Sequence, residues 1–246
     1  MMEITIVGSG DAFGSGGRLN TCFHVQARRT SFLIDCGATS LPAIKQLGIE
    51  RNAIDFILVT HFHADHFGGI PPFVLDAQLL AKRCSSLTIA GPPGLEEWFQ
   101  KAMDTAFPGS AVAPRKFEIS LVELRAGDRV EIHGVQITPQ FVRHGGPEGP
   151  FFGYRVELDE RVIAYTGDTE WTESLIHIAR NADLLIAEAY FFEKQIPFHL
   201  DYITLKRQLP RMSPKQVLLT HMNDDMLSHA ADVPEEKAHD GLILHI

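Results

Sequence analysis

The chain has 246 residues, of which 45% are hydrophobic and 22% charged, the composition of an ordinary globular protein. It contains no uninterrupted apolar run of 18 residues and its start lacks a basic segment, so we expect neither a membrane-spanning helix nor a secretory signal. The formal net charge of −9 disfavours long nucleic acid as a partner. Three widely spaced cysteines without a C-x-x-C pair indicate reduced thiols and a cytoplasmic location.

The first part of the chain predicts alternating strands and helices. A strand over 4–7 precedes the glycine-rich segment 8–17. Because a strand and not a helix follows that segment, we do not expect a nucleotide-binding loop there. The other elements predicted in this part are a hairpin over 21–26 and 31–36, helices over 40–47, 72–82 and 93–105, and strands over 54–60 and 87–90.

A second part of similar make-up is expected to begin near 114–117. Neither a linker nor a low-complexity tract separates the two parts, so residues 1–246 are expected to form one domain of the α/β class. The elements predicted here are strands over 117–124, 129–133, 135–142, 151–157, 161–165, 184–187, 216–220 and 242–245, helices over 171–180 and 204–209, and a glycine- and proline-rich loop over 143–150.

The segment 60–66 carries three histidines and one aspartate directly after the apolar run 56–59. The run is predicted to be a buried strand, which puts the cluster on a loop at its carboxyl end, where open α/β sheets bind ligands. Imidazole and carboxylate are suitable ligands for Zn²⁺, Mn²⁺ or Fe. We expect His61 and His63 to point to one ion, and Asp65 and His66 to serve a second. A solvated polar loop is the weaker interpretation.

Titratable residues follow other predicted strands in the same way. Asp35, His144, Asp168 and His221 each come at or just after the end of an apolar run. Loops at the ends of several strands are where such scaffolds assemble their sites, so we expect these side chains to join the cluster. Six histidines lack this context and are interpreted as ordinary structural or surface residues: His24, His133, His177, His229, His239 and His245.

The spacing His61-x-His63-x-Asp65-His66, followed by His144, Asp168 and His221, resembles the metallo-β-lactamase superfamily. The resemblance implies a four-layer αββα sandwich with two divalent ions at one edge, zinc first and manganese or iron as alternatives. It implies that one ion is held by His61, His63 and His144, the other by Asp65, His66 and His221, and that Asp168 bridges both. Asp35 matches a residue of the family that orients the ligands without binding an ion.

Two further segments resemble the ribonuclease Z branch of this superfamily. Gly8-Ser9-Gly10-Asp11 with Arg18-Leu19-Asn20 is similar to its opening, and 183–189 with His199 is similar to the region of its additional histidine. The second segment is still more similar to the small cyclic-phosphate phosphodiesterase of the carbon–phosphorus lyase pathway. The resemblance implies that Asp65 and His199 are catalytic, with a metal-bridging hydroxide as nucleophile and His199 contacting the scissile phosphate or protonating the leaving alkoxide.

The chain departs from both relatives. Only residues 145–167 separate His144 from Asp168, which leaves no room for the tRNA-binding arm of long ribonuclease Z, and no cysteine cluster follows Gly17. We therefore expect a phosphodiesterase for small or short phosphodiesters, with no membrane partner, and the relatives imply a homodimer. The alternatives are a ribonuclease Z-type RNA 3′-end endonuclease, a lactonase, thioester hydrolase or arylsulfatase, and a metal-bound accessory or sensor protein without turnover.

Overall fold

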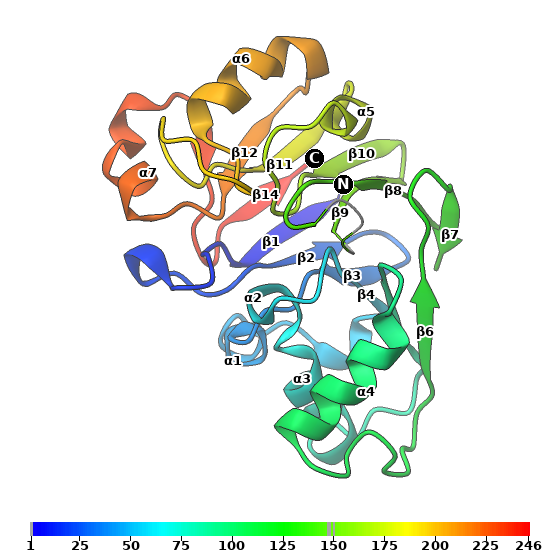
Figure 1. Cartoon of the computed structure of the whole chain (residues 1–246). Helices are drawn as coiled ribbons and strands as arrows, with labels where there is room; N and C mark the ends of the chain where they lie inside the picture. Colours follow the sequence, from blue (N-terminus) through cyan, green and yellow to red (C-terminus); the bar gives the residue numbers. More distant parts are fainter. Residues whose placement is uncertain (1, 147–148, 150) are drawn as a thin grey trace.

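The computed structural model describes residues 2–146, 149 and 151–246. Two mixed β-sheets face each other, and helices cover the outer face of each sheet (Figure 1). The four-layer α/β sandwich predicted from the sequence is therefore confirmed. Among the described residues, no helix combines the length and the apolar character that crossing a membrane requires.

The first sheet contains the N-terminal strands and one strand from the end of the chain. Its order is β14-β1-β2-β3-β4-β5-β6, in which the neighbours from β14 to β3 pair antiparallel and those from β3 to β6 pair parallel. The bounds are β1 Glu3–Gly8, β2 Cys22–Gln26, β3 Ser31–Ile34, β4 Phe56–Leu58, β5 Leu87–Gly91, β6 Ile119–Glu123 and β14 Ile243–His245. The helices on its outer face are α1 Ser40–Gln46, α2 Ala64–Phe67, α3 Ile70–Leu79 and α4 Leu95–Ala106.

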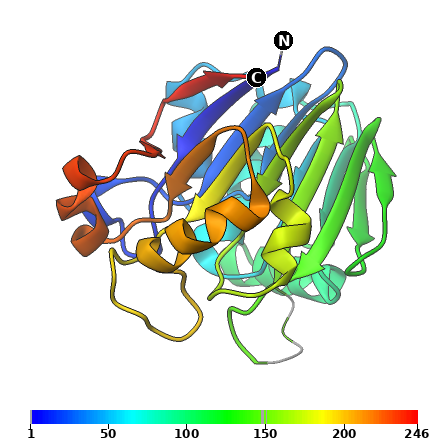
Figure 2. The same cartoon turned by 90° about the horizontal axis from the view of Figure 1, so that it is seen from above.

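The second sheet has the order β13-β12-β11-β10-β9-β8-β7. Its bounds are β7 Val130–Ile132, β8 Val135–Phe141, β9 Phe152–Leu158, β10 Arg161–Tyr165, β11 Leu184–Glu188, β12 Val217–Thr220 and β13 Glu236–Lys237. The helices of this half are α5 Ser174–Ala179, α6 Tyr202–Met212 and α7 Asp224–Ser228, and Figure 2 shows α5 and α6 lying across the sheet. Short 3₁₀ turns occur at Ser15–Gly17, Arg51–Ala53 and Ala230–Asp232.

The two sheets are joined by an apolar core and by hydrogen bonds. Phe23 of the first sheet meets Tyr165 of the second edge to face, with ring centroids 5.1 Å apart. The buried Tyr154 hydroxyl donates to the carbonyl of Val59 at 2.6 Å, which satisfies the one polar atom of a ring inside the core. The backbone N–H of Phe152 donates to the carbonyl of Thr60 at 3.0 Å. The second sheet thus holds the start of the histidine segment in place.

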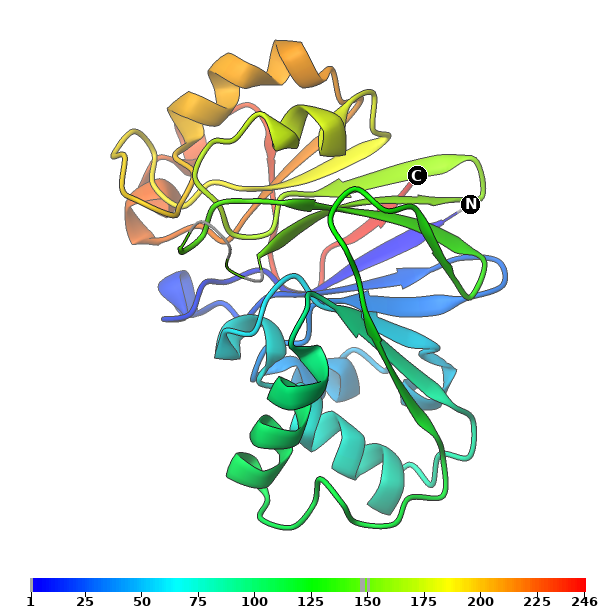
Figure 3. The same ribbon diagram turned by 45° about the vertical axis from the view of Figure 1, so that its right-hand side comes forward.

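The expected position of the second half was wrong. The strand predicted over 117–124 forms β6, which pairs with β5 in the first sheet, and the second sheet begins only at β7 (Figure 3). Apolar alternation identifies a strand but does not tell which sheet it joins. Helix α6 is longer than predicted because Asp201 caps it, accepting the N–H of Thr204 at 2.8 Å. Of the loop predicted over 143–150, residues 147, 148 and 150 lie outside the described part of the chain.

Candidate metal centre

Side chains that follow four different strands meet at one edge of the sandwich. The segment after β4 contributes four of them, and one each comes from the ends of β8, β10 and β12. All except His63 are buried. These are the seven residues that the sequence singled out as ligands: His61, His63, Asp65, His66, His144, Asp168 and His221.

The seven side chains form two groups. The candidate ligand atoms of His61, His63 and His144 lie within 4.8 Å of one another, and so do those of Asp65, His66, Asp168 and His221. Asp168 also reaches towards the first group, since its Oδ2 lies 3.6 Å from Nε2 of His144. A carboxylate at this position can contact both groups, as a bridging ligand must.

Several buried atoms of the two groups make no hydrogen bond within the described structure. They are Nε2 of His61, Nε2 of His66, Oδ1 of Asp168 and Nδ1 of His221. Leaving such atoms unsatisfied in a protein interior is costly, so atoms of this kind call for a ligand. Neutral imidazole nitrogens and carboxylate oxygens are donors that zinc and similar ions accept. The residues present therefore fit a pair of divalent cations.

The segment that carries Asp65 and His66 is a short helix, α2, where the sequence led us to expect a loop. His63 is the N-cap residue, and its carbonyl accepts the N–H of Phe67 at 2.8 Å. Four residues are too few to show helical periodicity in a sequence. The helix packs against the backbone after β3, where a Cβ on Gly37 would lie 2.2 Å from the carbonyl oxygen of Asp65. Only glycine permits this approach.

Asp35 connects the histidine segment to the first sheet. Its carboxylate accepts the Thr60 N–H at 2.7 Å and the Thr60 hydroxyl at 2.9 Å, and Nδ1 of His66 donates to it at 2.7 Å. Asp35 has a left-handed backbone conformation, with φ at 57°, which aspartate tolerates better than most residues. Because Nδ1 of His66 is engaged in this way, its Nε2 is directed at the centre.

His144 and His221 are also oriented by backbone contacts. Nδ1 of His144 donates to the carbonyl of Phe198 at 2.8 Å, which leaves its Nε2 facing His63, 3.1 Å away. His221 has φ at 55°, and its backbone N–H donates to the carbonyl of Ser9 at 3.1 Å. Nε2 of His221 lies 3.0 Å from Oδ2 of Asp168. A backbone carbonyl thus directs the His144 imidazole at the centre, whereas for His221 the bonded backbone positions the residue from which the imidazole reaches Asp168.

The electrostatics of the centre favour cation binding. Burial, reinforced by neighbouring histidines, lowers the pKa of His61 well below its usual value, so its ring is neutral and free to ligate. Burial by itself would raise the pKa of Asp168, but His221 and His66 outweigh it and hold that pKa well below the usual value. The centre therefore combines a neutral His61 with a charged Asp168. Against the effect of burial, Asp168 and Asp35 raise the pKa of His66 well above its usual value, so a cation would displace a proton from that ring.

His199 lies beside the second group, and its partner Glu188 was missed in the sequence. Nδ1 of His199 donates to Oε1 of Glu188 at 2.5 Å, and the imidazole stacks on Tyr190 with ring centroids 4.4 Å apart. Oε2 of Glu188 accepts the N–H groups of Thr169 at 2.8 Å and Leu200 at 3.2 Å. The sequence signal was present, since Glu188 is a carboxylate ending an otherwise apolar buried strand.

The Glu188 carboxylate sets the charge of His199. Burial by itself would lower the pKa of the imidazole, but Glu188 outweighs burial and raises that pKa to about 9. The protonated ring donates one N–H to Glu188. The imidazole also lines the hollow that contains Asp168 and His221. A protonated ring at this place has a second N–H that can serve an anion.

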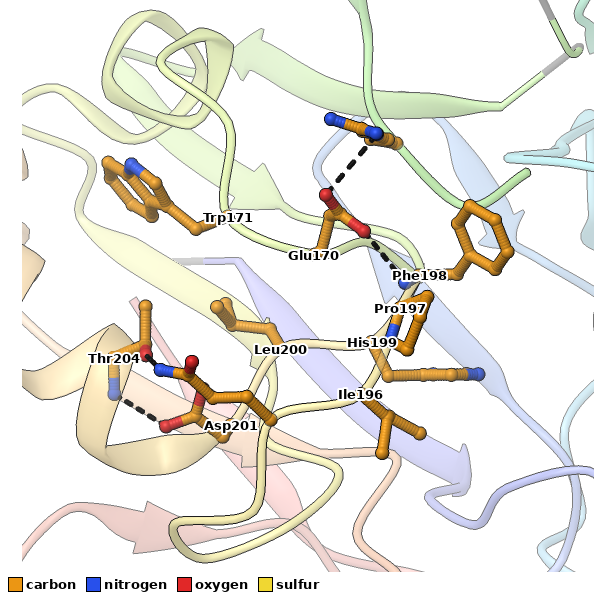
Figure 4. A pocket seen from close by; sticks show the side chains of 11 residues that line it. Glu170, Trp171, Ile196, Pro197, Phe198, His199, Leu200, Asp201 and Thr204 are labelled. Atoms are coloured by element: carbon orange, nitrogen blue, oxygen red, sulfur yellow. Dashed lines mark hydrogen bonds and ion pairs between the residues drawn. The ribbon is translucent and has the colours of Figure 1, made fainter. Parts of the chain in front are cut away.

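Two hollows meet at His199. One, of about 210 Å³, contains the centre and is lined also by Phe13 and Tyr190. The other, of about 520 Å³, lies beside the loop before α6; Figure 4 shows Trp171, Glu170 and Thr204 around it. In this second hollow Glu170 pairs with Arg143 at 3.2 Å and accepts the Phe198 N–H at 2.9 Å. The smaller hollow is the one that contains the candidate ligands.

Comparisons with known proteins agree with this architecture. Ribonuclease Z of Agathobacter rectalis is 26% identical, over 95% of this chain and 93% of its own length. The metallo-β-lactamase fold protein YhfI from Bacillus subtilis superposes with a TM-score of 0.81, at 22% identity and with 100% of both chains covered. The short form of human tRNase Z gives 0.79, at 21% identity and 99% of each chain.

A diphosphatase of the PhnP family shares the fold with a TM-score of 0.79, at 22% identity, covering 100% of this chain and 98% of that one. Together these relatives confirm the resemblance to the ribonuclease Z-like branch of the metallo-β-lactamase superfamily, and with it a metal-dependent hydrolase. The family model of the Anti-Pycsar protein Apyc1 matches residues 2–243, which is nearly the whole sequence. The chain therefore belongs to the Anti-Pycsar protein Apyc1 family.

Proposed function

We propose that this hydrolase is a phosphodiesterase for small or short phosphodiesters and that the seven clustered side chains hold its two divalent ions. The observation that carries the proposal is His199, a charged imidazole whose Nδ1 is fixed by Glu188 and whose ring borders the centre. Such a donor suits an anionic phosphoryl group. A lactone or a thioester presents no comparable negative charge before attack.

The ions would supply Lewis-acid polarisation of the phosphodiester and a lowered pKa for a water molecule, the chemistry typical of paired-metal hydrolases. His61, His63 and His144 would hold one ion, Asp65, His66 and His221 the other, and Asp168 would contact both. Asp65 is thereby part of the catalytic machinery. Zinc is the first candidate because the donor set is imidazole and carboxylate, and manganese and iron accept the same donors.

The proton on Nε2 makes His199 the general acid of the proposed reaction. Water adds to phosphorus, and the bond from phosphorus to the leaving alkoxide breaks. The imidazolium donates its Nε2 proton to the alkoxide, and the proton lost by the water restores it, so the products are a phosphomonoester and an alcohol. Glu188 keeps Nδ1 protonated and stabilises the charged ring throughout.

The size and charge of the site support a small or short substrate. The hollow that contains the centre measures about 210 Å³, which accommodates a phosphate and part of one substituent. The net charge of −9 disfavours a long polyanion. RNA 3′-end cleavage is the second candidate, favoured by the ribonuclease Z relatives that match 95% of the chain.

A substrate panel tests the proposal. The protein is reconstituted separately with zinc, manganese and iron(II), and each form is assayed on bis-p-nitrophenyl phosphate, a precursor tRNA with a 3′ trailer, a thioester and a lactone. We expect turnover of the phosphodiester to exceed that of the thioester and the lactone by at least a hundredfold. Preference for the thioester or the lactone would overturn the proposal, and selective cleavage of the precursor tRNA would favour the second candidate.

A further inference from the structure

The glycine-rich loop between β1 and β2 is held rigidly by carboxylates. Oδ1 of Asp11 accepts the N–H groups of Phe13 at 3.2 Å and Ser15 at 2.9 Å, and its Oδ2 accepts the Ser15 hydroxyl at 2.7 Å. Asp224 accepts the N–H of Gly16 at 2.9 Å. Gly16 has φ at 63°, a conformation that larger side chains rarely adopt. The loop therefore has one defined shape.

The base of this loop is joined to the metal centre. The carbonyl of Ser9 accepts the backbone N–H of His221 at 3.1 Å, and Asp240 fixes Ser9 from the other side by accepting its N–H at 2.9 Å and its hydroxyl at 2.8 Å. His221 is a candidate ligand. Any residue at the tip of the loop consequently has a fixed position relative to the centre.

Phe13 occupies that tip. Its side chain is 85% exposed, yet it lines the hollow that contains Asp65, Asp168 and His199. A single exposed phenylalanine needs no explanation on an ordinary surface. Here, however, the loop holds an exposed aromatic ring at the hollow that contains the candidate ligands, where it contributes nothing to the core.

We propose that Phe13 is a specificity-determining residue, an aromatic platform that stacks on a flat substituent of the phosphodiester, such as a nucleobase. The inference rests on the proposed function, since the centre must first bind the phosphoryl group. Once it does, the adjoining substituent leaves the hollow past Phe13. Stacking on an aromatic ring tolerates different bases, and the fixed loop reduces the entropy cost of forming the stack.

Binding of two matched ligands to the metal-loaded protein tests the platform without relying on turnover. Adenosine 5′-monophosphate and ribose 5-phosphate differ only in the base. We expect calorimetry to show the nucleotide binding about 5- to 150-fold more tightly than the sugar phosphate. Phe13→Ala should remove most of this ratio and leave the Kd of ribose 5-phosphate within about twofold, because the phosphate contacts remain. Phe13→Trp should retain the ratio, and Phe13→Leu, apolar but not aromatic, should lose it.

Phe107→Ala is the matched control. Phe107 is 39% exposed, at the C-terminal end of α4, and lines neither hollow at His199. Phe107→Ala should leave the ratio of the two ligand affinities unchanged. Two results would overturn the platform: equal affinity of the wild type for both ligands, or an unchanged ratio in Phe13→Ala. Hydrolysis of bis-p-nitrophenyl phosphate would in either case still support the proposed function. A wild type that hydrolyses no phosphodiester would instead overturn the proposed function, and the inference with it.

Discussion

Two buried carboxylates in this site each hold one histidine, with different consequences. Asp35 holds His66, whose side chain is 0% exposed, and turns its Nε2 towards the other candidate ligands. Glu188 holds His199, whose side chain is 22% exposed and borders the hollow. Both carboxylates raise the pKa of their histidine, but one pair orients a buried candidate ligand and the other holds the proposed proton donor at the hollow. What surrounds the imidazole decides which of the two roles the pair has.

The largest loss of metal and of activity is expected from removing the candidate ligand that contacts both groups. Asp168 contacts both groups of candidate ligands, so Asp168→Ala should lose at least one of the two ions and reduce kcat/KM by more than about a thousandfold. Elemental analysis by mass spectrometry and the phosphodiester assay check the two losses. Asp128→Ala, at an exposed aspartate, is the control and should change neither. An Asp168→Ala protein with full metal content and activity would contradict the ligand assignment.

A smaller loss of activity is expected from removing the charge of Glu188, the carboxylate that holds His199. In Glu188→Gln the burial that lowers the pKa of His199 is no longer opposed, so this pKa should fall from about 9. Protonated His199 is the proposed donor, so the variant should lose activity as pH rises through the lowered pKa. We expect a loss of about 10- to 100-fold at pH 8 and a smaller loss at pH 6.

The control for this pH profile is Glu170→Gln. Glu170 accepts the Phe198 N–H and pairs with Arg143, so its substitution removes a nearby carboxylate without breaking the bond to His199. Its activity should decline with pH as that of the wild type does. If Glu188→Gln and the wild type have the same profile from pH 6 to pH 9, Glu188 does not set the protonation of His199.

Asp35→Asn should weaken metal binding without removing the proposed proton donor. The amide retains the size of the carboxylate but weakens its bond to Nδ1 of His66, so metal affinity should fall about 10- to 100-fold. At saturating metal, kcat should return to within a few-fold of the wild type, because His199 is untouched. Titration with zinc under a competing chelator measures the affinity. A kcat that stays low at saturating zinc would show that Asp35 does more than orient a ligand.

His24 is a buried histidine without a carboxylate partner among the described residues, and its effect should be on stability instead of activity. It is 6% exposed, its Nε2 lies 2.8 Å from the Ser31 hydroxyl, and burial lowers its pKa to about 4. Since the unfolded state takes up the proton first, between pH 6.5 and pH 4, the free energy of unfolding falls as pH is lowered through this window. Below both pKa values, the free energy of unfolding has lost about 3 kcal/mol because of His24.

Denaturant unfolding in chelator, for the wild type and for His24→Gln, isolates this contribution. The other buried histidines are common to both proteins and cancel in the difference. The wild type should lose about 2–3 kcal/mol more than the variant between pH 7 and pH 4. Parallel curves would mean that His24 is not held neutral by its surroundings.

The sequence predicted that the seven candidate ligands lie together because its signals were local. The segment 60–66 brings four candidate ligands together, and the others follow apolar strands whose ends meet at one edge. It missed features that depend on packing. Helix α2 is too short for periodicity, the sheet of β6 depends on its pairing with β5, and the role of Glu188 appears only when a loop eleven positions later folds back onto it. Phe13 was equally hidden, since exposure beside a hollow is a property of the folded chain.

Metal content and turnover of one variant, His199→Ala, separate a proton donor from a metal ligand. His199→Ala should keep two ions per chain by elemental analysis, because His199 is not one of the seven proposed ligands and its Nδ1 is bonded to Glu188. Its kcat on bis-p-nitrophenyl phosphate should fall by about 10²- to 10⁴-fold, because the proton donor is lost. Loss of an ion together with activity would make His199 a ligand, and full metal content with unchanged kcat would contradict its role as the donor to phosphate.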